Sequence, residues 1–403
     1  MKKMGEKKEI IGLAAILSIV MFCTYAKMAN YNLADHNLNV LFYSYRDGFV
    51  AAGFIGTVWR VLNAVLPIEL MAYKPVYYTA KWMMVLYNIL VIILLLITYQ
   101  KSKANKRIMI PFIVLATVIS GGMFRSATTM GSFDMYEMII LLITMIVLFV
   151  EKAVWLSVPL VVIGMLIHPS FLFKGIPIII AILWYRSCRD IQKRSYYIAI
   201  RNVICIVSLV IFTLSEWCAI VSPGKEEEFI ALGRLLSQNG NSYDIGLATY
   251  AMRECSSIMP EWGYHQDNYV ALLVFFLCFS PYLLIGRNYY VHLYQRSSQN
   301  GIPHKLYRMM QLGGLALLPE FIFKVNYGYF ISEICLYYIL IFIFYIVAED
   351  KYIIEEIYHM DERIKERIPI PEILLIYPLA FMPFMDVSIS NVIHSLTRIF
   401  GAW

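Results

Sequence analysis

The stretch VYYTAKWMMVLYNILVIILLLITY, residues 76–99, decides the fold class of this chain. It runs for 24 residues and holds one charged side chain, Lys81. A helix needs about 20 consecutive apolar residues to cross a bilayer, so we expect residues 76–99 to span a membrane. The whole 403-residue chain is 60% hydrophobic and 15% charged, against roughly 45–50% and 25% in soluble domains. This composition excludes a soluble globular fold and predicts an all-α polytopic integral membrane protein.

Hydropathy predicts about eleven transmembrane helices in a single membrane domain over residues 1–403. The predicted spans are residues 10–26, 76–99, 108–120, 135–150, 154–167, 171–185, 196–220, 268–285, 309–323, 328–347 and 372–384. Residues 48–67 could add a short or re-entrant helix. Four lysines precede the first span, which fits a signal peptide or an uncleaved signal anchor. We expect the anchor, because no convincing small-x-small cleavage site follows and Lys27 ends the segment.

The distribution of basic residues predicts the orientation. With the N-terminus in the cytoplasm, the cytoplasmic segments hold 21 of the 34 Lys and Arg residues and the outside segments hold 11. An excess of this kind on alternating loops is what the positive-inside rule requires. We therefore expect a cytoplasmic N-terminus and an extracytoplasmic C-terminus.

The first long extracytoplasmic segment, residues 27–75, offers candidate catalytic carboxylates. Gly48, Gly53 and Gly56 place small residues along a mostly apolar interfacial or re-entrant helix, as close helix packing requires. Asp47 directly precedes this predicted helix, next to Arg46. A carboxylate there is stabilised by the helix dipole and could act as a general base, or it could only cap an interfacial helix. Asp35, beside His36, is a second candidate.

The second long segment, residues 221–267, is acidic and is predicted to cap the outer face. It carries three basic and seven acidic residues, which suit a cation, a hydroxyl-rich acceptor or a plain solvated loop. Its residues 229–236, FIALGRLL, predict a short helix that is apolar on one side.

Ionisable residues gather at the predicted outer ends of four further spans, on the same face as Asp47. Charges near membrane depth are costly, so each one is a site hypothesis. These residues are Arg125, Asp134 with Glu137, His168, and Glu320 with Lys324. Taken singly they could be an interfacial histidine, a helix ion pair or dipole caps. Together they predict a polar catalytic or binding cavity.

The absence of characteristic motifs excludes most classes of soluble enzyme. The chain contains no P-loop, no GxGxxG after a strand, no HExxH and no GxSxG. Its seven cysteines are scattered without metal-ligand spacing. We therefore expect no cofactor and no metal site, although a divalent cation stays open. The net charge of +6 is modest and does not indicate binding to nucleic acid.

The overall plan resembles bacterial membrane proteins of polysaccharide assembly, namely GT-C-type glycosyltransferases and EpsG-like or Wzy-like polymerases. Residues 164–170, GMLIHPS, resemble the Gly-x-x-x-His-x-Ser stretch of EpsG-like polymerases. Residues 48–56 and 131–134 are similar to stretches of uncharacterised relatives of this kind, from whose pattern the chain departs at Ala52, Asn326 and Tyr329.

The resemblance implies a GT-C-like or Wzy-like helical bundle in the bacterial cytoplasmic membrane. Such enzymes use saccharides on polyprenyl phosphate or pyrophosphate at the outer face, beside other polysaccharide-assembly proteins. Asp47 or Asp35 would be the catalytic carboxylate, with His168 as a further catalytic residue. The substrate-binding residues would be Arg46, Arg125, Asp134, Glu320 and Lys324, with the cations stabilising the departing phosphate.

Two alternatives stay open. A transporter or flippase of a lipid-linked saccharide would need charged residues along a path through the membrane, and Lys81, Arg201, Glu216 and Glu333 are the few candidates within spans. The departures from the family pattern also allow a non-catalytic subunit of a polysaccharide synthase complex.

Overall fold

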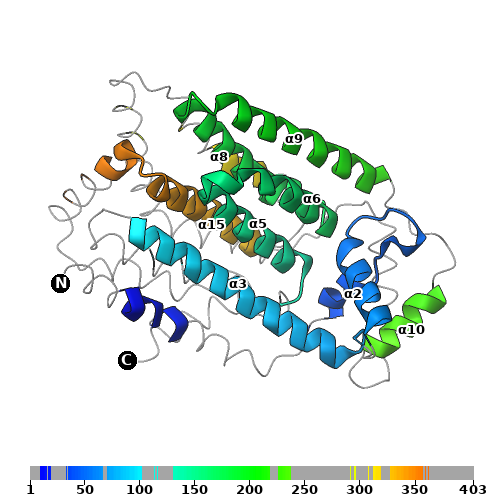
Figure 1. Ribbon diagram of the computed structural model, residues 1–403. Coiled ribbons are helices and arrows are strands. Elements are labelled where there is room, and N and C mark those ends of the chain that lie inside the picture. Colours follow the sequence, from blue (N-terminus) through cyan, green and yellow to red (C-terminus); the bar gives the residue numbers. More distant parts are fainter. Residues whose placement is uncertain are drawn as a thin grey trace. The chain divides into compact units, whose positions relative to one another are not determined.

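The computed structural model describes residues 10–15, 17–19, 33, 35–66, 70–101, 113, 116, 130–217, 226–236, 291, 295, 307, 312–318, 327–356, 359 and 362. All regular secondary structure in these residues is helical (Figure 1). The chain forms two compact units. The first unit comprises Met1–Val20, Val91–Met123 and Glu261–Trp403, and the second comprises Met21–Leu90 and Phe124–Pro260.

Three helical stretches of the described chain are long and apolar enough to cross a membrane. They are Tyr73–Lys101, Phe171–Arg189 and Arg194–Ser215. Helix α9 (Arg194–Trp217) exposes Val203, Ile206 and Val210 along one face, the pattern expected of a helix that contacts lipid. The chain is therefore a helical membrane protein.

Several other predicted spans coincide with helices of the described chain. Residues 135–150 correspond to α5 (Phe133–Phe149), and residues 328–347 to α15 (Tyr327–Val347). Residues 154–167 correspond to the 3-10 helix η3 (Glu151–Leu156) followed by α6 (Ser157–Ile167). The predicted spans 268–285 and 372–384 lie outside the described residues, as do most of 108–120 and 309–323.

The core of the second unit is formed by the helices α5, α6, α8 (Ile176–Arg189) and α9, which pack against one another. Helix α5 packs against α6, α6 against α9, and α8 against α9 (Figure 1). Met145, Val161, Met165 and Ile182 are fully buried between them. Since α5 and α6 form a hairpin, the start of α5 lies at the same end as the end of α6.

A buried aromatic ring fixes the chain reversal after α6. The short helix α7 (Phe171–Lys174) begins with Phe171, whose side chain is completely buried. A Cβ added at Gly164 would lie 2.6 Å from the Phe171 ring, and a Cβ at Gly175 would collide with the same ring. The two glycines therefore form a slot for Phe171, which holds α6, α7 and α8 in one arrangement.

The described part of the first long segment contains three helices before α3 (Tyr73–Lys101), but its apolar helix begins later than the sequence predicts. Helix α2 (Phe54–Val65) follows the 3-10 helices η1 (Asp35–Leu41) and η2 (Tyr45–Asp47). Gly48 and Ala52 have positive φ values of 122° and 59°, which interrupt a helix before α2. The expectation that Asp47 directly precedes this helix is therefore wrong.

Helix α2 lies against the backbone of residues 41–43, because a Cβ on Gly56 would collide with the Tyr43 carbonyl oxygen. Its twelve residues extend for about 18 Å, too short to cross a bilayer core of about 30 Å. The helix predicted at 229–236 is confirmed as part of α10 (Glu226–Leu236).

In the first unit, the 3-10 helix η4 (Gly313–Leu317) packs against α15. A Cβ on Gly314 would approach the Tyr338 hydroxyl to 2.8 Å, so the glycine permits this close approach. Beyond α15, the buried Asp350 carboxylate accepts hydrogen bonds from the Tyr307 hydroxyl and from the backbone N–H of Ile353. Asp350 thus caps the next helical turn.

Candidate functional site

The start of α5 places two carboxylates on one side of the helix. Gly131 adopts a φ of 83°, and Ser132 then caps α5 by accepting a hydrogen bond from the Met135 N–H. The Asn37 side chain donates to the Met130 carbonyl oxygen at 2.9 Å, which ties this turn to η1. Asp134 falls in the first turn and Glu137 three residues later, so their side chains project from the same side.

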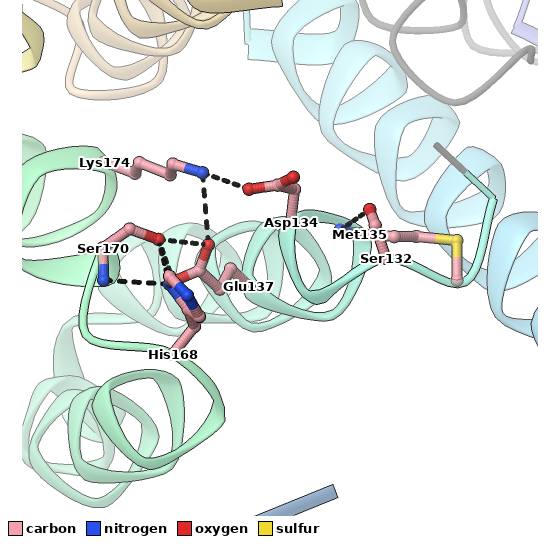
Figure 2. Close-up of polar contacts among 7 residues, drawn as sticks. All are labelled: Ser132, Asp134, Met135, Glu137, His168, Ser170 and Lys174. Carbon is pink, nitrogen blue, oxygen red and sulfur yellow. Dashed lines mark hydrogen bonds and ion pairs between the residues drawn. The ribbon is translucent and has the colours of Figure 1, made fainter. Parts of the chain in front are cut away.

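The end of α6 brings three more polar side chains to the same place. His168 leaves the helix in an extended conformation, and Ser170 occupies the N-cap position of α7. Lys174 ends α7 one turn later. We call Asp134, Glu137, His168, Ser170 and Lys174 the buried cluster (Figure 2).

The members of the buried cluster form one hydrogen-bonded network. The Lys174 ammonium pairs with Asp134 and lies 3.4 Å from the Glu137 Oε2. The Ser170 hydroxyl donates to Glu137 Oε1 at 2.9 Å and lies 2.6 Å from His168 Nδ1. The Ser170 backbone N–H also donates to His168 Nδ1 at 3.1 Å (Figure 2).

Burial divides the cluster into an inner and an outer part. The side chains of Glu137 and Lys174 are 0% and 1% exposed, whereas those of Asp134 and His168 are 30% and 26% exposed. Buried charges persist only when they are paired and hydrogen-bonded. Glu137 and Lys174 are therefore the inner partners that hold two accessible groups, a carboxylate and an imidazole.

Aromatic side chains of the first long segment lie beside this cluster. The Phe133 ring is 5.2 Å from the His168 ring and 6.3 Å from the Tyr43 ring, measured between centroids. The Tyr45 hydroxyl donates to the Leu166 carbonyl oxygen at 3.2 Å, near the end of α6. Partial burial raises the pKa of Tyr45 to about 12, so its hydroxyl stays protonated near neutral pH. Residues 43–45 thus bring the first segment next to His168.

Of the residues predicted from sequence, the structure brings Asp134 and His168 together in the buried cluster. Asp35 lies in η1 and Asp47 in η2, but their side chains are outside the described part of the structure. Arg46 is exposed in η2. Arg125, Glu320 and Lys324 lie outside the described residues.

Two members of the cluster, Ser170 and Lys174, were not named as site hypotheses from sequence, whereas Glu137 was named with Asp134 but given no role. Ser170 could have been found from the Gly-x-x-x-His-x-Ser stretch, and Lys174 from its charge at the predicted outer end of a span. Nothing in the local sequence indicates that Lys174 reaches Asp134, 40 residues earlier.

Among the described residues, no group of three or more His, Cys, Asp and Glu side chains is arranged to hold a metal ion. Within the buried cluster, His168 and Asp134 can exchange protons and form hydrogen bonds. No family model matches this chain, and no curated protein or solved structure matches it.

Proposed function

We propose that the chain is a membrane glycosyltransferase or polysaccharide polymerase. It would transfer a saccharide from polyprenyl phosphate or pyrophosphate to an acceptor hydroxyl at the extracytoplasmic face of a bacterial cytoplasmic membrane. The lipid part of such a donor lies in the bilayer, which fits a chain without a nucleotide-binding motif.

One observation carries this proposal. His168 and Asp134 are partly exposed, and each contacts an inner partner, Glu137 or Lys174, that is almost fully buried. Acid–base and electrostatic catalysis both require groups that are held in place before the substrate arrives. The buried cluster has this property, and it lies where the ends of α5 and α6 meet the first long segment.

The roles follow from charge and position. A carboxylate of the first segment, Asp47 or Asp35, would deprotonate the acceptor hydroxyl. Arg46, with Arg125 and Lys324, would stabilise the departing phosphate. Asp134 and Glu320 would bind hydroxyl groups of the saccharide, and His168 would be a further catalytic residue.

The test is polymer production at matched protein levels in a strain that lacks the native copy. Loss of a general base lowers a rate by about 10²–10⁴-fold, so Asp47→Asn or Asp35→Asn should nearly abolish polymer, according to which carboxylate is the base. Asp190→Asn is the matched control, because Asp190 is a carboxylate at the opposite end of α8. Wild-type polymer from Asp47→Asn, Asp35→Asn and His168→Ala alike would contradict a catalytic function and favour a non-catalytic subunit.

A transporter of a lipid-linked saccharide is the second candidate, favoured by the almost complete burial of Glu137 and Lys174. Ionisable residues inside a helical membrane bundle are typical of transport pathways. The two functions differ in where the lipid-linked intermediate accumulates when the gene is deleted. A lost polymerase leaves single units accessible to a membrane-impermeant reagent from outside, whereas a lost transporter leaves them inaccessible.

A further inference from the structure

The hydrogen bonding of His168 Nδ1 determines which ring nitrogen carries a proton. The Ser170 backbone N–H donates to Nδ1 at 3.1 Å. A backbone N–H can only donate, so the nitrogen that accepts from it is unprotonated in the neutral ring. The proton of a neutral imidazole must then be on Nε2.

The contacts of the Ser170 hydroxyl also bear on which nitrogen of His168 carries the proton. The Ser170 Oγ makes short contacts with His168 Nδ1 at 2.6 Å and with Glu137 Oε1 at 2.9 Å. Two such hydrogen bonds require two protons, and one hydroxyl supplies one. The second proton belongs either to the Glu137 carboxyl or to His168 Nδ1. Because the Ser170 backbone N–H needs an acceptor at Nδ1, the proton on Glu137 is favoured. In that arrangement Glu137 donates to Ser170, Ser170 donates to Nδ1, and Nε2 of His168 carries the hydrogen of the neutral ring.

We propose that His168 presents an N–H at Nε2 and acts on its substrate as a hydrogen-bond donor, not as a general base. Ser170 and Glu137 are the positioning residues that hold the ring in this state. The donor role rests on the proposed function, whereas the state of the ring does not. An N–H at this position suits a phosphate oxygen of a lipid-linked donor as the phosphate departs. The general base is then left to the carboxylates of the first segment.

In the competing arrangement the hydrogen bonds between the same residues run in the opposite direction. With a proton on Nδ1, His168 would donate to Ser170, Ser170 would donate to an ionised Glu137, and a bare Nε2 would be a base. The Ser170 backbone N–H would then face another N–H at 3.1 Å. The two arrangements make opposite predictions for Nε2, so one measurement separates them.

The first measurement is the ¹⁵N NMR spectrum of the histidine-labelled full-length protein in lipid nanodiscs. His168 is assigned among the seven histidines by the signal that disappears in His168→Gln. We expect a protonated Nε2 in the wild type and also in Ser170→Ala, which keeps the backbone N–H. An unprotonated Nε2 in the wild type would overturn the proposal, and an unprotonated Nε2 in Ser170→Ala alone would overturn the role of the backbone N–H.

The second measurement is polymer production by three variants of His168. A Gln amide nitrogen can take the place of Nε2–H, whereas an Asn amide reaches only the position of Nδ1. We expect His168→Ala and His168→Asn to lose about 10²–10³-fold, as for a lost donor to a developing anion, and His168→Gln to stay within about tenfold of wild type. Equal loss in all three variants would overturn the donor role.

The two measurements distinguish a failure of this proposal from a failure of the proposed function. If polymer does not depend on the gene at all, the proposed function fails and the donor role fails with it. The NMR spectrum still decides between a protonated and an unprotonated Nε2 in that case.

Discussion

The two ends of the helices α5, α6 and α8 both hold ion pairs, but they differ in burial. At one end lies the buried cluster, in which Lys174 is 1% exposed. At the other end Lys193 pairs with Glu151 at 3.0 Å and Asp190 at 3.6 Å, and we call these three residues the exposed cluster. The Lys193 and Glu151 side chains are 49% and 63% exposed.

This comparison shows that ion pairs between similar residue types contribute differently to stability at the two ends. Exposed ion pairs contribute little because water solvates and screens both partners. Buried ion pairs leave an uncompensated charge when one partner is lost, so they constrain the structure around them. The exposed cluster links η3 to the α8–α9 turn, whereas the buried cluster is where a substrate could meet groups that are held in place.

The largest expected effect is from Lys174→Met. This change removes the cation that Asp134 and Glu137 share, and breaking a buried pair costs about 3–5 kcal/mol of unfolding free energy. The measurement is thermal unfolding of the detergent-solubilised protein, followed by intrinsic fluorescence.

The matched control is Lys193→Met, which removes the cation of the exposed cluster and should leave the unfolding temperature close to that of the wild type. Glu137→Gln sharpens the comparison, because Lys174 keeps Asp134 and the Gln side chain can still form a hydrogen bond with Ser170 Oγ. It should cost less than Lys174→Met. Equal losses of thermal stability from Lys174→Met and Lys193→Met would show that burial does not make the ion pairs at the two ends differ in stability.

The sequence predicts much of this architecture but not the partners within it. Apolar runs predict α3 (Tyr73–Lys101), α9 and α15 to within a few residues, because length and hydropathy are local properties. Asp134 and His168 were predicted as site residues because each sits at the outer end of a predicted span. The contact of Ser170 with Glu137 joins residues 33 apart in sequence and depends on the packing of α5 against α6.

The position of Asp47 is a feature that the sequence predicts incorrectly. An apolar, glycine-spaced run predicts a helix from residue 48, yet the helix begins at Phe54. Gly48 and Ala52 adopt positive φ angles, and the helix that follows lies against the backbone of residues 41–43. The Tyr45 N–H donates to the Thr57 Oγ1 at 2.7 Å, a tertiary contact that no periodicity encodes.

A smaller effect is expected from Gly164→Ala, which tests whether the reversal after α6 holds the buried cluster together. The added methyl group would lie 2.6 Å from the Phe171 ring, and overpacking of this kind costs about 1–3 kcal/mol. Polymer production should fall with stability, because His168 and Ser170 lie in the turn that Phe171 fixes. Thermal unfolding and polymer yield are measured on the same variant.

The control for this prediction is Gly12→Ala, since a Cβ at Gly12 meets nothing within 4 Å. Alanine there should be neutral or slightly stabilising. The double variant Gly164→Ala with Phe171→Leu should recover part of the loss, because the smaller side chain makes room for the methyl group. A Gly164→Ala protein as stable as the wild type would mean that the slot around Phe171 is not tight.

The smallest expected effect is the pH dependence of the exposed cluster. The hydrogen bond to Glu151, with its negative charge, raises the pKa of Lys193 above its ordinary value of 10.5. A raised pKa means that the folded state holds the proton more tightly than the unfolded state. The stabilisation is therefore fully present below pH 10.5 and is lost as the pH rises through the folded-state pKa. Unfolding temperatures of the wild type and Lys193→Met should thus differ slightly near neutral pH and converge above pH 10.5, the ordinary lysine pKa. Divergence of the two proteins at high pH would contradict the sign of this shift and with it the assignment of Glu151 as the partner of Lys193.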